Sequence, residues 1–146
     1  MSIYKLPKLI DINAKSRLIK NRESLLILSR CIELEHPEVI ERFKGKCAIL
    51  TVCPEEEHIN HVGFKLAGIL ARDNYKEVIV LSVDGSMHCV QLHFMVEEIF
   101  KIMSLDSKVK RRHLVLTKGE VIEVSRECVK KARFLSKVNK LLKMES

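Results

Sequence analysis

The chain has 146 residues, of which 47% are hydrophobic and 31% are charged, and its formal net charge is +7. This composition excludes a disordered chain, and the length suits a single domain. No apolar run reaches the roughly 18 residues that cross a bilayer, and the N-terminal segment lacks the apolar region of a signal peptide. We therefore expect a cytoplasmic protein that has no membrane partner.

The positive charge lies in the two flanks of the chain. Residues 1–46 carry 10 basic and 6 acidic side chains, residues 47–104 carry 4 and 8, and residues 105–146 carry 12 and 5. The centre is therefore acidic, with a net charge of −4, between flanks of +4 and +7. A nucleic-acid surface, if there is one, is expected on the flanks.

The cysteines and histidines gather in the acidic centre. Three of the five cysteines and four of the six histidines fall between residues 47 and 100. An odd number of cysteines without CxxC spacing argues against a disulfide framework or a zinc finger. We therefore look for chemistry in this stretch.

The first 46 residues predict a helical extension. Residues 1–12 contain Pro7 and are expected to be extended, with Leu9 packed on the body. Asn21 is a suitable N-cap for a helix over residues 21–35, in which Cys31 is expected as a small core residue. Pro37 then opens a second short helix that Gly45 ends.

Two apolar runs of strand length follow, CAILTVC (47–53) and EVIVLSV (77–83). Continuous apolar runs are typical of strands buried on both faces, as in parallel sheets. Each run precedes a helical pattern. Pro54 and the glutamates at 55–57 suit the first turn of the first helix, with a start near His58 as the alternative, and Ser86 caps the second. Lys118-Gly119 separates two further β-rich runs and predicts an antiparallel hairpin, and Ser125 caps one final helix.

These elements predict a single α/β domain over residues 1–146. Its small three-layer Rossmann-like sheet combines a parallel core with an antiparallel edge hairpin, between the N-terminal helices and a C-terminal helix. Ligands bind such sheets outside the carboxyl ends of the parallel strands. Cys53-Pro54 and Asp84-Gly85-Ser86 follow the two predicted strands and mark those ends.

Thiolate and imidazole ligands at these ends suit zinc, iron or an iron–sulfur cluster. The candidate metal ligands are Cys53, His58, His61, His88, Cys89 and His93. A cluster held by this chain alone needs three or four well-placed cysteines, so a cluster shared with a partner is the alternative. Two core cysteines beside solvent-facing histidines would also produce this pattern.

Two other chemistries remain open at the same strand ends. Cys89 at a helix N-terminus is a candidate nucleophile, which a neighbouring histidine could deprotonate. Asp84, Gly85 and Ser86 are candidates for holding a cofactor or phosphate on backbone amides. The chain has neither GxGxxG nor GxxxxGK[ST], and the glutamates at 55–57 would repel a phosphate.

The basic flank gives a nucleic-acid alternative. Lys130, Arg133, Lys137 and Lys140 form a continuous stripe if the last helix is unbroken, and Arg111 and Arg112 add to it. No aromatic platform accompanies these residues, so the backbone or shape of RNA or DNA would be recognised.

Cysteines at strand ends within a small α/β chain make residues 47–100 similar in organisation to iron–sulfur subunits of hydrogenase and reductase complexes. No shared motif accompanies the similarity, so it assigns no residues. We expect a metal- or iron–sulfur-associated accessory protein related to electron transfer. Its expected partner is a redox or metal-enzyme complex, and a homo-oligomer is compatible with the sequence. A nucleic-acid-binding module and a small Cys/His enzyme are the alternatives.

Overall fold

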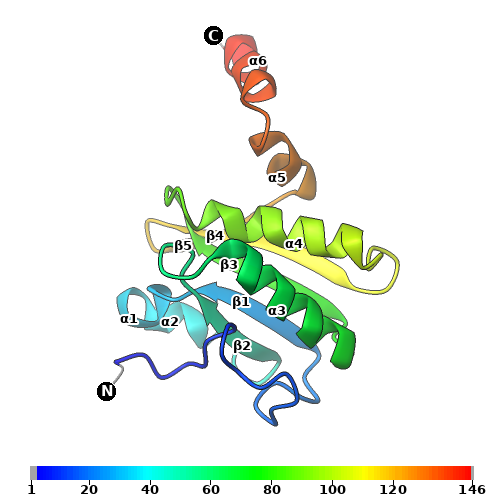
Figure 1. The fold of residues 1–146 in the computed structure, drawn as a ribbon. Helices are drawn as coiled ribbons and strands as arrows, with labels where there is room; N and C mark the ends of the chain where they lie inside the picture. The colour runs from blue at the N-terminus through cyan, green and yellow to red at the C-terminus, as the bar shows by residue number, and fades with distance from the viewer. Residues whose placement is uncertain (1–2, 146) are drawn as a thin grey trace.

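A five-stranded sheet organises the computed structural model, which describes residues 3–145 (Figure 1). The strand order is β2-β1-β3-β4-β5, and only the β4–β5 pair is antiparallel. The strands are β1 (Ser24–Ser29), β2 (Cys47–Val52), β3 (Glu77–Val83), β4 (Lys110–Thr117) and β5 (Glu120–Val124). The predicted small α/β Rossmann-like fold with an antiparallel edge hairpin is confirmed.

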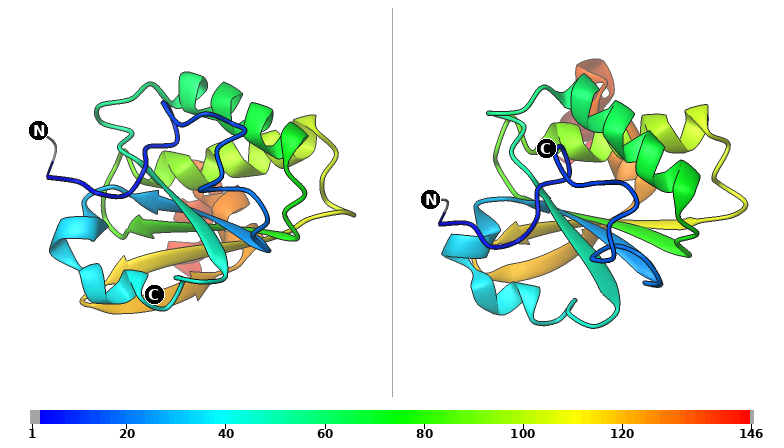
Figure 2. Two further views of the ribbon diagram at one scale, coloured as in Figure 1. Left: turned by 90° about the horizontal axis from the view of Figure 1, so that it is seen from below. Right: turned by 60° about the horizontal axis from the view of Figure 1, so that its bottom comes forward.

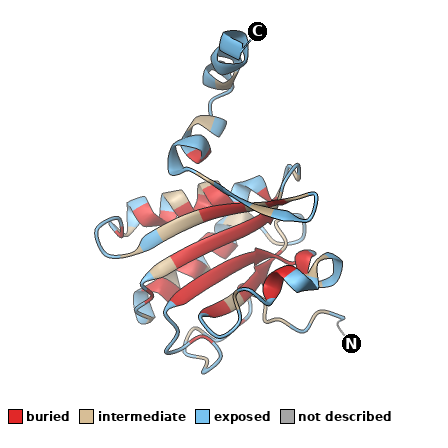
Figure 3. Ribbon diagram, turned by 180° about the vertical axis from the view of Figure 1, so that it is seen from behind, coloured by how far each residue is buried: buried red, intermediate tan, exposed pale blue. Residues whose placement is uncertain are grey.

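Helices connect the strands and cover both faces of the sheet. They are α1 (Ile32–Glu35), α2 (Pro37–Ile40), α3 (Ile59–Arg72), α4 (Val90–Ile102), α5 (Arg126–Ala132) and α6 (Leu135–Glu145). The long helices α3 and α4 lie on one face, while the short helices α1 and α2 lie on the other (Figure 2). The buried strands run between these two layers (Figure 3).

The helix predicted over residues 21–35 is wrong, because its first half is β1, a central strand. All six residues of β1 are buried. Leu25 and Ile27 pack under α3 and α4, whereas Leu26 and Leu28 pack under α1 and α2. A strand between two others, covered on both faces, requires an unbroken apolar run. Such a run also satisfies a buried helix, so periodicity alone could not separate the two.

Residues 1–46 are accordingly part of the sheet domain and not a helical extension. Besides supplying β1, this segment runs beside β2, where Leu9 N–H donates to the Thr51 carbonyl at 3.0 Å. Leu9 and Ile19 are fully buried against the α3/α4 face. The prediction that Leu9 packs on the body is therefore confirmed, while residues 1 and 2 lie outside the described part.

The second half of the chain follows the prediction except at its end. Lys118 and Gly119 both have positive φ and form the tight turn between β4 and β5. Ser125 caps α5, with its Oγ accepting from Cys128 N–H at 3.0 Å. The single final helix is wrong, because Arg133 and Phe134 separate α5 from α6. No helix of residues 3–145 combines the length and apolar character needed to cross a membrane.

Candidate functional site

The carboxyl ends of β1, β2 and β3 meet at one edge of the sheet. The crossover from β1 to β2 runs through α1 and α2 on one face, and the crossover from β2 to β3 runs through α3 on the other. The connections after the neighbouring strands β1 and β2 therefore leave toward opposite faces of the sheet. Open α/β sheets bind ligands at such a point. A cavity of about 210 Å³ lies at this position.

Three cysteines from three different strand ends line this cavity. Cys31 follows β1, Cys53 follows β2, and Cys89 begins α4 after the β3 loop. Cys89 is buried, Cys53 is half-buried and Cys31 keeps contact with solvent. His88 lines the same cavity. Cys53, His88 and Cys89 therefore line one cavity, but not from neighbouring strands as predicted, because β1, which carries Cys31, lies between β2 and β3.

The sequence predicts Cys31 as a small core residue and not as part of the site, because the apolar run before it fits a helix as well as a strand. In the structure Cys31 is exposed and follows β1. Its position directly after an apolar run was the available signal, the same signal that identified Cys53. Burial raises the pKa of the Cys31 thiol, and the nearby thiols Cys89 and Cys53 raise it further. Negative charge on one thiol is therefore disfavoured by the others, as expected for thiols that share a small space.

The hydroxyl group of Ser29, which also lines this cavity, has no hydrogen-bond partner among the described residues. Ser29 is 1% exposed, and its buried hydroxyl makes no hydrogen bond with any residue that the structure describes. Ser29 also belongs to the cavity lining. Buried hydroxyls nearly always have a partner, so an orphaned one in a cavity wall indicates that a ligand or water completes it.

The acidic loop beside the cavity is largely neutralised by a buried arginine. Arg30 is 3% exposed and pairs with Glu56 at 3.0 Å and with Glu57. The other oxygen of Glu57 accepts from the Cys53 N–H at 3.1 Å. The ion pair therefore fixes the loop that carries Cys53, and the glutamates oppose negative charge in the cavity less than the sequence suggested.

The remaining predicted metal ligands do not join this cavity. His58 caps α3, with its Nδ1 accepting from Asn60 N–H at 3.1 Å, and His61 stacks on it with the ring centroids 5.2 Å apart. These two histidines are exposed neighbours, and neither lines the cavity. His93 is buried elsewhere on α4. Within residues 3–145 no three His, Cys, Asp or Glu side chains are placed to hold one metal ion.

The Asp84-Gly85-Ser86 turn does not cap α4 as predicted, because α4 begins at Val90 with Cys89 as its N-cap and without a side-chain cap bond. Gly85 has a φ of +89° at the turn, and Ser86 Oγ accepts from the Cys89 N–H at 3.2 Å. Asp84 is exposed, and its N–H donates to the Leu116 carbonyl. Ser86 lines the cysteine cavity, while Asp84 and Gly85 line an adjoining cavity of about 280 Å³.

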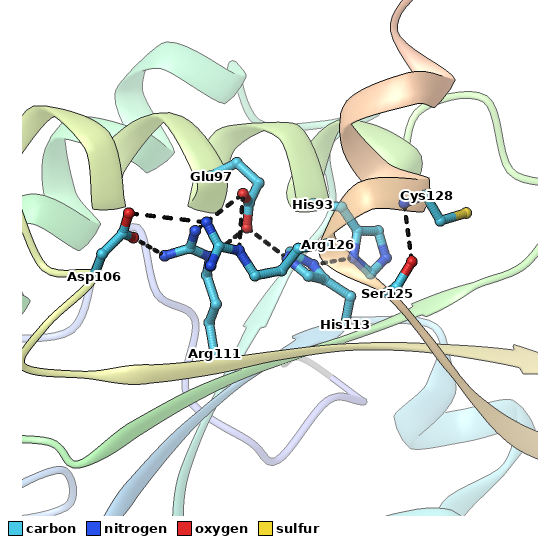
Figure 4. A network of polar contacts seen from close by, with 8 residues as sticks. All are labelled: His93, Glu97, Asp106, Arg111, His113, Ser125, Arg126 and Cys128. Atoms are coloured by element: carbon cyan, nitrogen blue, oxygen red, sulfur yellow. Dashed lines mark hydrogen bonds and ion pairs between the residues drawn. The ribbon is translucent and has the colours of Figure 1, made fainter.

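A row of buried polar side chains that the sequence did not predict begins at that adjoining cavity. Figure 4 shows its part from His93 to Arg111. Ser82 Oγ lies 2.7 Å from His93 Nε2, and His93 Nδ1 lies 2.9 Å from His113 Nδ1. His113 Nε2 lies 2.8 Å from Glu97 Oε2, and Glu97 in turn pairs with Arg111. The sequence signals were His93 and Glu97, one helical turn apart, and a serine within an apolar strand.

The carboxylate sets the direction of every hydrogen bond in this chain. Glu97 can only accept, so His113 donates from Nε2 and its Nδ1 accepts from His93. His93 Nε2 is then the acceptor for the Ser82 hydroxyl. Burial and the neighbouring His113 lower the pKa of His93 to about 4, so both rings are neutral near pH 7. This row of hydrogen bonds can pass a proton between the Ser82 hydroxyl, beside the cavity, and the Glu97 carboxylate.

The charges at the far end of the chain are firmly held. Burial raises the pKa of Glu97, but hydrogen bonds from His113 and Arg111 outweigh it and leave that pKa below its usual range. Arg111 is 4% exposed and also pairs with Asp106. The Arg111 guanidinium is therefore occupied by the carboxylates of Glu97 and Asp106 and is not available to a phosphate backbone.

The other basic candidates are scattered over several elements. Arg112 on β4 pairs with Glu123 on β5 at 2.8 Å. Lys130 lies on α5, and Arg133 lies at the break and lines a groove between α3 and α4. Lys137 and Lys140 are exposed on α6, with Lys137 above the Phe134 ring. The break between the helices interrupts the predicted stripe, which assumed one continuous helix.

Comparison with known proteins agrees with this architecture. A family model described as a Rossmann-like domain matches residues 17–145. Neither the curated proteins nor the solved structures give a match to this chain. The family match begins before β1 and reaches into α6, so it includes all five strands and the cysteine cavity. The chain belongs to the family of Rossmann-like domains.

Proposed function

We propose that this protein binds an iron–sulfur cluster through the thiolates of Cys31, Cys53 and Cys89 and serves as a cytoplasmic electron-transfer accessory protein. The observation that carries the proposal is that these three side chains, from three separate strand ends, line one cavity. Thiolates are the characteristic ligands of iron–sulfur clusters.

The placement of the thiols favours a cluster over a single ion. No three ligand side chains among residues 3–145 are placed to hold one metal ion. In a four-iron cluster each cysteine bonds a different iron atom, so the thiolate sulfurs lie farther apart than the ligands of a mononuclear site. Three thiols around a cavity of about 210 Å³ suit that wider arrangement.

The surroundings of the cavity supply what a cluster needs besides its ligands. The orphaned Ser29 hydroxyl can donate to a cluster sulfur, and such hydrogen bonds tune the reduction potential. Iron between the three thiols would relieve the mutual repulsion that raises the pKa of Cys31. Arg30 holds the Cys53 loop in place through Glu57.

Three cysteines leave one iron of a four-iron cluster without a thiolate. His88 lines the same cavity and is the candidate for that position. A ligand from a redox partner is the alternative source, and it would make the cluster shared between two proteins. Either arrangement lets the cluster take one electron from a partner and pass it on.

Anaerobic reconstitution with ferrous iron and sulfide tests the proposal. We expect visible charge-transfer absorption with matching iron and sulfide contents, and loss of both in Cys31→Ser, Cys53→Ser and Cys89→Ser. Cys128→Ser is the matched control, because Cys128 is an exposed thiol on α5 outside the cavity.

The outcomes separate the alternatives. A protein that takes up no iron, or a Cys128→Ser variant that loses as much iron as the other three, contradicts the proposal. Stoichiometric zinc that depends on the same three cysteines would replace the cluster with a zinc site. Retention of iron in His88→Ala would assign the last iron to an external ligand.

A further inference from the structure

The last helix presents an apolar face that residues 3–145 leave largely uncovered. Leu135, Val138 and Leu142 fall at i, i+3 and i+7, on one side of α6. Leu135 is 82% exposed and Leu142 is 61% exposed, and no residue of α6 is buried. The helix extends beyond α5, away from the sheet (Figures 1 and 3). An apolar stripe of this kind marks an interaction surface.

An apolar groove lies between α3 and α4 of the same chain. Its volume is about 650 Å³. A Cβ on Gly63 would lie 3.4 Å from Met95 Cγ, so the missing side chain lets the floor of the groove form. Phe64 and Ile102 stand at its sides, 84% and 68% exposed. A groove between two helices is the kind of apolar site in which an amphipathic helix can lay its apolar face.

We propose that α6 of a second copy of this chain docks in the groove between α3 and α4, and that the exchange is reciprocal. Each protomer would supply one helix and one groove, as a two-fold dimer requires. Reciprocal docking buries both apolar stripes and both grooves at once, so the contact area is twice that of a one-way contact.

The connection before α6 favours a second copy over the helix's own groove. Arg133 lines the groove, and α6 begins only two residues later. A hydrogen bond holds this short connection to the end of α5, since the Phe134 N–H donates to the Lys131 carbonyl at 2.9 Å. To reach its own groove, α6 would have to reverse direction within Arg133 and Phe134. Short connections of this kind favour exchange between protomers.

Charge favours the groove over pairing of two α6 helices with each other. The helix carries Lys137, Lys140 and Lys143, so two copies side by side would repel. Glu98 lines the groove, is exposed, and has no ion pair among the described residues. Arg133 lines the groove as well, so the groove presents one charge of each sign and does not repel the lysines of an incoming α6 as a second α6 would.

The mass of the full chain in solution, measured by light scattering after size exclusion, tests the dimer. We expect a dimer for the natural chain and a monomer for Leu135→Glu with Leu142→Glu. Ser136→Glu with Met144→Glu is the matched control, because these two positions lie off the stripe and neither is one of the α6 lysines, so the variant should remain a dimer. Phe64→Glu with Ile102→Glu should also give a monomer, with thermal unfolding used to check its fold.

Mixing the two monomeric variants identifies the docking mode. The helix variant keeps its groove and the groove variant keeps its helix, so one contact is restored and a heterodimer is expected. A groove variant that remains dimeric would instead indicate helix-on-helix pairing and overturn the proposal. A monomeric natural chain at tens of micromolar overturns it too, whether α6 folds onto its own groove or binds anionic vesicles instead.

Discussion

His93 and His113 contact each other through their Nδ1 atoms, 2.9 Å apart, and join α4 to β4 beneath the surface. The pair is 3% and 1% exposed, and Glu97 closes it from the other side at 2.8 Å. Both rings must remain neutral for the hydrogen bonds to run in one direction from Ser82 to Glu97. The fold therefore depends on the protonation state of two buried imidazoles.

The stability of the protein should consequently fall in mild acid. Burial and His113 lower the pKa of His93 to about 4, from 6.5 for a free imidazole. Between these values the unfolded chain binds a proton that the folded chain does not, so the free energy of unfolding decreases as the pH falls. One group contributes at most about 1.4 kcal/mol per pH unit, or about 3 kcal/mol over the window. Urea unfolding between pH 7 and pH 4 measures this.

Replacing His93 should flatten that dependence. His93→Gln keeps a hydrogen-bonding side chain but cannot take up the proton, so the slope should decrease by up to one proton. His61→Gln removes a histidine from the exposed start of α3 and serves as the control. An unchanged slope in His93→Gln would show that other groups cause the acid sensitivity.

Removing the charge of Glu97 should be costly even at neutral pH. Glu97→Gln leaves Arg111, which is 4% exposed, without its buried counterion and leaves the His113 N–H with a weaker acceptor. Breaking one partner of a buried ion pair costs about 3 kcal/mol. Glu98→Gln, one residue away and exposed, should cost less than about 0.5 kcal/mol. Equal effects in the two variants would reject the buried pair as a stabilising unit.

Local patterns predict the second half of this fold better than the first. The strand over residues 77–83, the helix cap at Ser125 and the turn at Lys118-Gly119 each follow from residues adjacent in sequence. By contrast, β1 is a strand because β2 and β3 flank it, and no residue near Leu26 carries that information. The apolar run at residues 24–29 fits either a buried helix or a buried strand.

The candidate site shows the same limit. The sequence places Cys53 and Cys89 after strands because it predicts those strands. It does not place Cys31 after a strand, because it does not predict β1. His93 is a candidate metal ligand from its sequence position, but in the structure it points into the interior toward Ser82. Its true partner, His113, lies on β4, and only the three-dimensional packing of α4 against the sheet brings the two together.

Cluster binding should protect a defined set of thiols. In the loaded protein, Cys31, Cys53 and Cys89 should resist alkylation, while Cys128 reacts at the rate of an exposed thiol. Chelating the iron should release Cys31, although its raised pKa keeps it slower than a free thiol near pH 7. Mass spectrometry of the alkylated peptides measures each site. Equal protection of Cys128 would contradict the assignment of the ligands.

Ser29 gives a test in which the loaded and empty proteins respond with opposite signs. In the empty protein its hydroxyl is buried without a partner among the described residues. Ser29→Ala should therefore be neutral, or raise the free energy of unfolding by about 1 kcal/mol. In the loaded protein the hydroxyl would donate to a cluster sulfur, which stabilises the more negative, reduced form. Ser29→Ala should then lower the reduction potential without changing the iron content.

The matched control for Ser29→Ala is Ser82→Ala, on β3. The Ser82 hydroxyl has a partner, His93 Nε2 at 2.7 Å, so its removal should lower the free energy of unfolding by about 1 kcal/mol. It lines the adjoining cavity and not the cysteine cavity, so the reduction potential should stay unchanged. Denaturant unfolding of the empty proteins and a redox titration of the loaded ones give both numbers.

A Ser29→Ala variant that is as destabilised as Ser82→Ala would mean that the Ser29 hydroxyl already has a partner. An unchanged potential in the loaded variant would mean that the hydroxyl does not face the cluster.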